Sequence, residues 1–465
     1  MSLRPVIVGG GSAGMAAACE LARFGVDSLL IDEASRLGGV VFRGPLRSGV
    51  DLGYLGARYN AALNKLHKEF EANAARIDVR LNTRVVGGES GQRLVVLDGE
   101  EQLSEIDYSH LLLSAGCHER NVPFPGWTLP GVILLGGLQL QIKSGVVKPL
   151  GTTVIAGTGP LLPLIACQLH GAGVKVEGVY EACALGKIAR ESLALLNKPQ
   201  LFLDGLSMLG YLKLNGIPMH YGWGVVGAVG EDEVSEVRLA PYGDDWQPDM
   251  TRVQRVKAQT LAVGYGFIPR TQLSQQMGLS HGFSEDGYLR AESDVWQRSS
   301  EAHVHLAGDL CGIRGGEAAM LTGRIAAVSM LMQAGLISDA EALGLRDRYL
   351  SKLGAIKRFR AGVDRYTLRG NQQINLPTED TLICRCENVK RSEIDRALAQ
   401  GVEDMAGLKM RTRVSMGDCQ GRMCVGYCSD RLRQATGRND VGWLRPRFPI
   451  DPIPFSAFQS LGTEA

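Results

Sequence analysis

Short apolar runs that end in glycine recur along the chain, and they define its predicted architecture. Residues 5–8 and 29–31 are uncharged runs typical of buried parallel strands. Between them, up to about residue 24, the apolar positions take the spacing of a helix. The strand pattern returns at residues 110–113, 152–156 and 303–306. Strands that alternate with helices predict an α/β fold built on parallel sheets.

The turn after the first strand has the pattern G-x-G-x-x-G in its full strand–helix–strand setting, which is typical of dinucleotide binding. We expect Gly9 to form the tight turn, Gly11 to let the backbone approach a pyrophosphate, and Gly14 to let the helix pack closely. Ser12 and Ala13 open the helix, where free N–H groups hold phosphates. The complete pattern favours a bound dinucleotide over a glycine-rich turn without a ligand.

Two acidic residues follow the second strand, and either could bind the ribose hydroxyls of the dinucleotide. Asp32 has the expected spacing from Gly9. Glu33 has the expected spacing back from the glycine pair at residues 38–39, of which Gly39 is a further candidate contact. We keep both acids as candidates.

Two later turns indicate which dinucleotide is bound. One follows the strand at residues 110–113 and contains Gly116. The other follows the strand at residues 303–306, contains Gly308 and Asp309, and precedes a second helix pattern.

With the first turn, these motifs resemble the two-dinucleotide-domain flavoproteins of the glutathione- and thioredoxin-reductase-like superfamily over about residues 1–340. The resemblance implies Rossmann folds and bound FAD. It also implies that Gly308 and Asp309 contact the ribityl chain and pyrophosphate, with the next helix pointing its N-terminus at the flavin. An adenine nucleotide in place of FAD stays open as an alternative.

A second turn of the same kind is incomplete. Gly157 and Gly159 supply its first two glycines. Leu162 stands at the third position, where it should push the helix away from the strand. No basic cluster suited to a 2′-phosphate follows, and residues 1–340 contain no C-x-x-C or C-x-x-x-x-C pair for disulfide reduction. We therefore expect a NAD-domain-like scaffold that does not use NAD(P).

Five of the ten cysteines gather in one short region: Cys384, Cys386, Cys419, Cys424 and Cys428. Such a cluster in a cytosolic chain favours metal binding over disulfides. Four thiolates can hold a [2Fe–2S] core, whereas structural zinc prefers C-x₂₋₄-C pairs to the tighter C-x-C found here. The pattern C-x-C…C-x-x-x-x-C resembles the bacterioferritin-associated ferredoxin-like domain. The resemblance implies that the first four cysteines are the ligands, and that Cys428 is a packed free thiol unless one of the four is not a ligand.

These patterns divide the chain into parts. They are a discontinuous FAD-binding domain at 1–118 and 255–340, a NAD-domain-like insert at 119–254, a linker region at 341–377, a small α-rich [2Fe–2S] domain at 378–435 and a tail at 436–465. The tail is rich in Pro and Phe. It is either a segment in a subunit interface, which we favour, or a strap over its own domain.

Charge and composition indicate a globular protein without a nucleic-acid partner or a membrane-spanning helix. The formal net charge is +1, which gives no support for nucleic-acid binding. The hydrophobic fraction of 45% and the charged fraction of 21% fit a globular protein. The sequence has no signal-peptide pattern and no run of about 18 uncharged apolar residues, so we expect no transmembrane helix.

The FAD motifs, the incomplete second turn and the cysteine pattern together resemble the alpha subunits of bacterial amino-acid and opine dehydrogenases. Shared phrases lie at residues 120–127, 129–132 and 384–387. Within that family, the likeness to the cyanide-forming glycine dehydrogenases extends along the whole chain, including residues 138–143 and 443–450. It implies oxidation of glycine to HCN and CO₂, with four electrons passed to an acceptor. It also implies a heterotrimer that contains a glycine-oxidase-like FAD subunit together with a small [2Fe–2S] subunit, peripherally associated with the cytoplasmic side of the inner membrane.

The residues themselves bear on the role of this chain in such a complex. A two-electron flavin that feeds a one-electron cluster suits an electron relay. No obvious carboxylate-binding arginine stands at a flavin motif; Arg314 is the nearest candidate, and we assign no catalytic residue. We therefore expect the partner subunit to carry out glycine oxidation. Three alternatives stay open: the alpha subunit of another amino-acid or opine dehydrogenase, a self-sufficient NAD(P)H-dependent reductase, and a non-enzymatic iron–sulfur assembly or storage factor.

Overall fold

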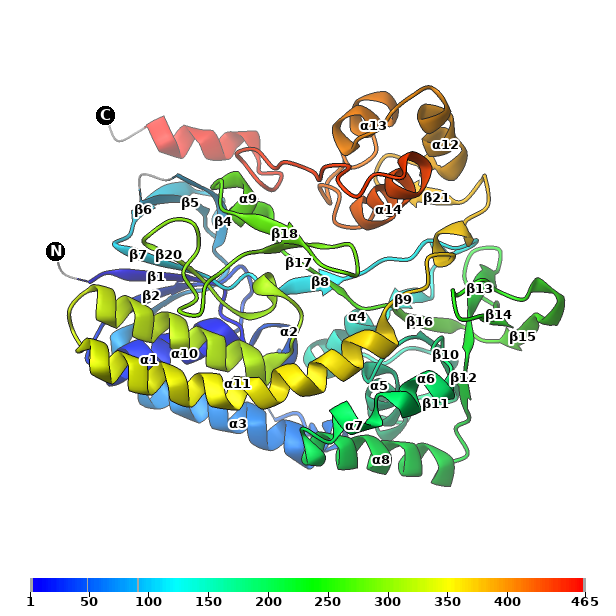
Figure 1. The fold of residues 1–465 in the computed structure, drawn as a ribbon, viewed down its shortest axis with the longest axis horizontal. Coiled ribbons are helices and arrows are strands. Elements are labelled where there is room, and N and C mark those ends of the chain that lie inside the picture. Colours follow the sequence, from blue (N-terminus) through cyan, green and yellow to red (C-terminus); the bar gives the residue numbers. More distant parts are fainter. Residues whose placement is uncertain (1–2, 48, 90–91, 463–465) are drawn as a thin grey trace.

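The computed structural model describes three parts of the chain, residues 3–47, 49–89 and 92–462, which fold into three units (Figure 1). The portions of the expected domains at residues 1–2, 48, 90–91 and 463–465 lie outside the described residues. Two units are α/β with one parallel sheet each, and the third is small and mostly helical. The predicted fold class is confirmed.

The first unit is built on a parallel sheet with the strand order β20-β7-β1-β2-β3. Its strands are β1 Pro5–Val8, β2 Ser28–Ile31, β3 Ile77–Arg80, β7 His110–Leu113 and β20 Val304–Leu306. Side chains alternate between its faces, so that Ile7 and Leu112 pack on helices whereas Val6 and Leu111 pack on a second sheet. That sheet is antiparallel and consists of β4 Arg84–Glu89, β5 Arg93–Leu97 and β6 Leu103–Asp107.

Two helices of the first unit meet at the dinucleotide turn. The helices that pack on this sheet include α1 Ser12–Arg23, α3 Ala57–Ala72 and α10 Gly316–Gln333, and the short α2 Gly39–Phe42 lies beside α1. A Cβ on Gly323 of α10 would lie 2.1 Å from the Ala13 carbonyl oxygen, so the two helices pack backbone to backbone. A Cβ on Gly316 would lie 3.4 Å from Ser12 Oγ. The positive ends of α1 and α10 therefore lie side by side.

The second unit has a parallel sheet with the order β12-β11-β10-β16-β9. Its strands are β9 Val132–Leu134, β10 Thr152–Gly157, β11 Lys175–Glu181, β12 Met219–Tyr221 and β16 Thr260–Gly264. A three-stranded sheet of β13 Trp223–Val229, β14 Glu236–Pro241 and β15 Gln254–Lys257 is attached to it. The boundary expected at residue 254 is wrong, because β16 pairs with both β10 and β9 and so belongs to this unit.

Shorter elements complete the two large units. They are α4 Leu135–Leu140, α5 Leu161–Gly171, α6 Leu185–Arg190, α7 Ser192–Leu195, α8 Pro199–Leu214, α9 Gln272–Gln276, β18 His281–Phe283 and β19 Leu289–Ala291. The two units are joined through an antiparallel pair, β8 Cys117–Glu119 and β17 Phe267–Pro269. No helix in the described ranges is both long enough and apolar enough to cross a membrane.

The expected linker at 341–377 is wrong over most of its length. Helix α11 Asp339–Thr367 runs along α10 and then reaches the second unit (Figure 1). Ser338 caps it by accepting a hydrogen bond from the Glu341 N–H. Leu345, Tyr349 and Leu353 are buried on one face, and their four-residue spacing is a helix signal that the sequence contained.

The third unit is a small bundle of α12 Arg391–Ala399, α13 Met405–Thr412 and α14 Val425–Thr436 beside β21 Leu382–Cys384 and β22 Val389–Lys390. The apolar side of its first helix faces the core, since Ile394 is 0% and Ala397 is 4% exposed. After α14 the chain returns to the first unit, where the Ile450 N–H donates to the Val86 carbonyl at 2.8 Å. Ala457, in the final short helix Phe455–Gly462, is buried against β4–β6.

The tail is therefore a strap over its own chain, the reading that we did not favour. Phe455 within it is 90% exposed, so part of the strap stays accessible.

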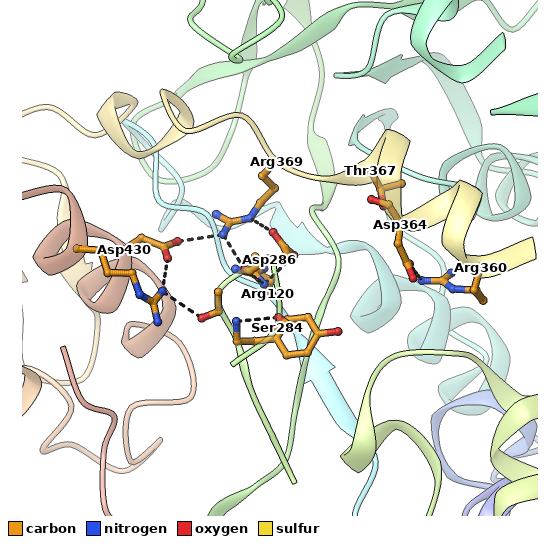
Figure 2. Close-up of polar contacts among 11 residues, drawn as sticks. Arg120, Ser284, Asp286, Arg360, Asp364, Thr367, Arg369 and Asp430 are labelled. Atoms are coloured by element: carbon orange, nitrogen blue, oxygen red, sulfur yellow. Dashed lines mark hydrogen bonds and ion pairs between the residues drawn. The ribbon is translucent and has the colours of Figure 1, made fainter. Parts of the chain in front are cut away.

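A buried network of charges fixes the third unit to the other two (Figure 2). Arg120 and Arg369 both donate to Asp286, at 2.8 and 3.0 Å, and Arg369 also donates to Asp430 of α14 at 3.0 Å. Arg433 of α14 reaches the Gly287 carbonyl at 3.3 Å. The Arg120 side chain is only 2% exposed, so its charge depends on these partners.

Candidate functional site

A cleft at the carboxyl edge of the first sheet contains nearly every residue predicted to bind a dinucleotide. Its volume of about 310 Å³ is comparable with that of small-molecule sites. The predicted residues that line it are Gly9, Gly11, Ser12, Ala13, Asp32, Glu33, Gly39, Gly116, Gly308 and Asp309. Gly14 lies behind it, where a Cβ would be 2.0 Å from the Gly9 carbonyl oxygen, so Gly14 permits the helix to pack against the turn.

The floor of the cleft leaves room for a phosphate at Gly11. A Cβ built there would have the Gly39 Cα, at 3.7 Å, as its only protein neighbour within 4 Å among the residues that the structure describes. The space beside Gly11 is therefore open to a ligand, at the N-terminus of α1 and next to that of α10. Aligned N–H groups at helix N-termini favour an anion, so this part of the cleft fits the pyrophosphate of a dinucleotide.

The two acids after β2 have different surroundings. Asp32 accepts hydrogen bonds from the Gly10 N–H at 2.6 Å and from the Ala34 N–H at 2.7 Å, so both of its oxygens bond the backbone. Burial raises the pKa of Asp32. The Glu33 side chain is 46% exposed and pairs with Arg270 at 2.6 Å. Burial disfavours its charge, but Arg270 and Arg84 outweigh burial and the pKa of Glu33 lies below its ordinary value. Asp32 thus shapes the turn, whereas Glu33 lines the cleft with a carboxylate that bonds side chains and not the backbone of the turn.

Asp309 orders the loop between the two positive helix ends. Its Oδ1 accepts from the Arg314 N–H at 2.8 Å and from the Gly315 N–H at 3.1 Å, directly before α10. Cys117 Sγ donates to its Oδ2 at 3.7 Å. Burial, and then the charge of Asp309, raise the pKa of Cys117 well above its ordinary value. Cys117 is therefore a protonated thiol in this site.

Several residues that line the cleft come from segments far apart in the sequence, and the sequence analysis missed them. They are Arg43, Arg84, Arg270, Arg422 and Asp451. Arg422 lies between two of the clustered cysteines and forms an ion pair with Asp451 of the tail. The Arg422 carbonyl also accepts from His118 Nε2 at 3.1 Å. The loop from Cys419 to Cys424, called the cysteine loop below, therefore contributes directly to the wall of the dinucleotide cleft, near Glu33.

The four cysteines predicted as ligands form two pairs in the third unit. The thiols of Cys384 and Cys424 are within hydrogen-bonding reach of each other, as are those of Cys386 and Cys419. Cys384 and Cys424 are buried, whereas Cys386 is exposed. Among residues 3–47, 49–89 and 92–462, no group of three or more His, Cys, Asp or Glu side chains is arranged to hold a metal ion. Two separate thiol pairs suit a core of two iron atoms with two thiolates each.

Close packing holds the cysteine loops in this arrangement. A Cβ on Gly417 would lie 2.2 Å from the Cys386 Cβ, so only glycine fits there, a requirement that the sequence did not reveal. Cys428 is 0% exposed and lies one helical turn after Cys424, with its thiol near that of Cys424. It packs in the core behind the paired cysteines.

The second glycine turn is covered by this chain's own helix α11. Glu181, at the end of β11, accepts hydrogen bonds from the Gly159 N–H at 2.8 Å and the Cys183 N–H at 2.9 Å. A Cβ on Gly159 would lie 3.2 Å from Thr367 Cγ2, at the end of α11. Leu162 is 0% exposed and belongs to the core of this unit. A pyrophosphate approaching Gly159 would therefore meet Thr367.

The fold and the two sites define a flavoprotein with a cluster domain. The description pyridine nucleotide-disulphide oxidoreductase matches residues 3–335, and the description BFD-like [2Fe-2S] binding domain matches residues 382–434. These families imply FAD and a [2Fe–2S] cluster as cofactors, and the cleft and cysteine pairs of this chain fit both. A solved structure titled L-proline dehydrogenase from P. horikoshii has the same fold, with a TM-score of 0.70 and 20% identity over 98% of this chain and 79% of that one.

The chain is 74% identical to hydrogen cyanide synthase subunit HcnB of Pseudomonas aeruginosa over 465 residues, which is 100% of both chains. It is 73% identical to the protein of the same name from Pseudomonas protegens, over 98% of both chains. A more distant relative, an opine oxidase chain of Rhizobium meliloti, is 32% identical over 96% of both chains. The chain thus belongs to the family of hydrogen cyanide synthase subunits HcnB, within the pyridine nucleotide-disulphide oxidoreductases.

Cys419→Ser should remove the cluster and leave FAD bound. Cys419 is only partly buried, so the substitution removes a thiolate without opening the core. The glycine turn predicted to hold the dinucleotide is built within the first unit. The visible absorption and the EPR signal of the reduced cluster should disappear, while released FAD should stay at one equivalent. Cys428→Ser is the matched control and should keep the cluster. Loss of FAD together with the cluster would show that the two sites depend on each other.

Proposed function

We propose that this chain is the flavin and iron–sulfur electron-relay subunit of a hydrogen cyanide synthase, in which a partner subunit oxidises glycine to HCN and CO₂. The 74% identity over the full length is the observation that carries this proposal. It is supported by the contact of the cysteine loop with the dinucleotide cleft through Arg422. Both proposed redox sites belong to one chain, and hydrogen bonds of Asp286 and Asp430 with Arg369 join the cluster unit to the rest of it.

In the first site, we propose that Gly9, Gly11 and the N-terminal residues Ser12 and Ala13 hold the pyrophosphate of FAD. Glu33 binds the ribose hydroxyls, because the Asp32 oxygens already bond the backbone. The remaining proposed contacts are Gly39, Gly116, Gly308 and Asp309, which line the same cleft. When bound, FAD accepts or donates two electrons and the cluster carries one at a time. The residues of this chain position both groups and keep the Cys117 thiol protonated.

In the third unit, we propose Cys384, Cys386, Cys419 and Cys424 as the cluster ligands. The pairing of their thiols supports this assignment. Cys428 is proposed to be a packed free thiol, since four thiolates complete a [2Fe–2S] core.

We also propose that the second α/β unit does not bind NAD(P). Thr367 lies against Gly159, and Glu181 accepts the hydrogen bond of the Gly159 N–H. Burial raises the pKa of Glu181 to about 7. Both of its oxygens accept hydrogen bonds from backbone N–H groups of this chain, which leaves this acid engaged within the unit. This arrangement supports a unit that serves as a scaffold, and it argues against a self-sufficient NAD(P)H-dependent reductase.

Three of the four arginines that line the cleft are paired within the chain, which supports the proposal that glycine is oxidised elsewhere. Arg84 and Arg270 pair with Glu33, and Arg422 pairs with Asp451, whereas Arg43 forms no ion pair among the described residues. Arg314, the nearest candidate for a substrate carboxylate, is not among the residues that line the cleft. The proposed partners are a glycine-oxidase-like FAD subunit together with a small [2Fe–2S] subunit, in a heterotrimer. The proposed location is the cytoplasmic side of the inner membrane, with peripheral attachment.

The assembled complex, in its wild-type and Cys384→Ser forms, tests this division of labour. Anaerobic glycine should reduce a partner flavin first and the cluster of this chain later. With Cys384→Ser, glycine should still reduce the flavin, but multiple turnover with a large acceptor should be slow or absent. NADH and an opine serve as control substrates and should leave the flavins oxidised. If glycine reduces the flavin of the isolated chain and cyanide appears, the catalytic site is here and the relay proposal is wrong.

A further inference from the structure

Ser415 lies against the buried pair of cysteines. It is 1% exposed, and its backbone has a φ of +70°, an uncommon conformation for a residue other than glycine. The hydroxyl oxygen of Ser415 is 3.2 Å from Cys424 Sγ. Its backbone N–H donates to the sulfur of Cys384. One residue therefore reaches both sulfurs of the buried pair.

The neighbouring loop fixes the Ser415 side chain in this position. A Cβ on Gly421 would lie 3.1 Å from the Ser415 Cβ and 3.3 Å from its Oγ. Gly421, which lies between Cys419 and Cys424, has a φ of +81°. The cysteine loop thus closes over Ser415, and the hydroxyl has little freedom to turn away from Cys424.

The second pair of cysteines, Cys386 and Cys419, has different partners. Cys386 receives a backbone hydrogen bond from Cys419, and its exposure leaves it open to water. Water cannot serve the buried pair in the same way, because Cys384 is 1% and Cys424 is 0% exposed. At the buried pair, hydrogen bonds from Ser415 take the place of hydrogen bonds from water.

We propose that the Ser415 hydroxyl raises the reduction potential of the cluster. This inference rests on the proposed ligand set. A ligating Cys424 is a thiolate and accepts only, so the Ser415 O–H must be the donor. Reduction adds one electron to the cluster, with no bond made or broken, and increases the negative charge on the sulfurs. A donor to sulfur stabilises the reduced form more than the oxidised form, because the bond strengthens with that charge. Ser415 is therefore a positioning residue that tunes the cluster as an electron acceptor.

The test compares Ser415→Ala with Ser429→Ala in the full chain. Ser429 is a matched control, since it is also buried in the third unit but its hydroxyl has no hydrogen-bond partner among the described residues. An EPR-monitored redox titration should show a lower midpoint potential for Ser415→Ala at unchanged cluster content, and no shift for Ser429→Ala. The signal of one exchangeable proton coupled to the cluster should also disappear in Ser415→Ala alone.

A second variant covers the case in which alanine does not tolerate the positive φ. Ser415→Gly adopts this φ freely and should lower the midpoint potential in the same way. An unchanged midpoint in a variant that keeps its cluster would overturn the inference while leaving the relay proposal intact. If neither variant assembles a cluster but Ser429→Ala does, Ser415 is a structural residue and the inference is wrong. Absence of a cluster in the wild-type chain would instead refute the proposed ligand set.

Discussion

Gly11→Val is expected to weaken FAD binding by about 100-fold without unfolding the chain. The nearest protein atom to a Cβ at this position is 3.7 Å away, so the fold accommodates the side chain. Its φ of −80° is also ordinary for any residue. The new side chain would, however, fill the space through which a pyrophosphate reaches the backbone. Titration of the apo chain with FAD, followed by flavin fluorescence, measures the effect.

Two other glycines serve as controls for this experiment. Gly344→Val lies on the open surface of α11, where a Cβ meets no described atom within 4 Å, and should bind FAD normally. Gly14→Val brings its Cβ to 2.0 Å from the Gly9 carbonyl oxygen and should disturb the fold itself. Normal FAD affinity in Gly11→Val would mean that the dinucleotide does not lie over this turn.

Asp286→Ala is expected to release the cluster unit from the rest of the chain. Asp286 is the shared acceptor of Arg120 and Arg369 (Figure 2). Its removal would leave the Arg120 charge without a carboxylate at 2% side-chain exposure. Loss of one partner from a buried ion pair costs about 3–5 kcal/mol. Chemical unfolding, monitored through the visible absorption of the cluster, should begin at a clearly lower denaturant concentration, and protease should cleave near residues 370–381.

Asp380→Ala provides the comparison on the same unit. The Asp380 side chain is 86% exposed and pairs with Lys390 at 2.9 Å, so its loss should leave unfolding nearly unchanged. Equal behaviour of the two variants would show that the buried network does not hold the units together.

The first dinucleotide-binding turn could be predicted from the sequence because the glycines that form it stand close together in the chain. Gly9, Gly11 and Gly14 stand in one turn, and their spacing alone specifies the geometry. The choice between Asp32 and Glu33 could not be made in this way. It depends on which carboxylate the Gly10 N–H bonds, and that contact exists only in the folded turn.

Contacts between distant segments explain most of what the sequence did not reveal. Arg422 and Glu33 are brought near each other by packing of the third unit on the first, and no local pattern encodes this. The same holds for Thr367 over Gly159. Helix α11 is a different case, because its apolar residues do have helical spacing in the sequence. The many charged residues among them led us to interpret the segment as a linker.

The strap formed by the tail bears on how the cofactors enter the protein. Ile450 and Asp451 line the dinucleotide cleft, together with residues from the first strand of the chain. During synthesis the other residues that line this cleft, the latest of which is Arg422, emerge from the ribosome before Ile450 and Asp451 of the strap. The newly made chain therefore passes through a stage in which the cleft lacks one side and the cysteine loop is not yet anchored to Asp451. We expect FAD to have its widest access to the cleft at that stage, before the strap adds its part of the wall.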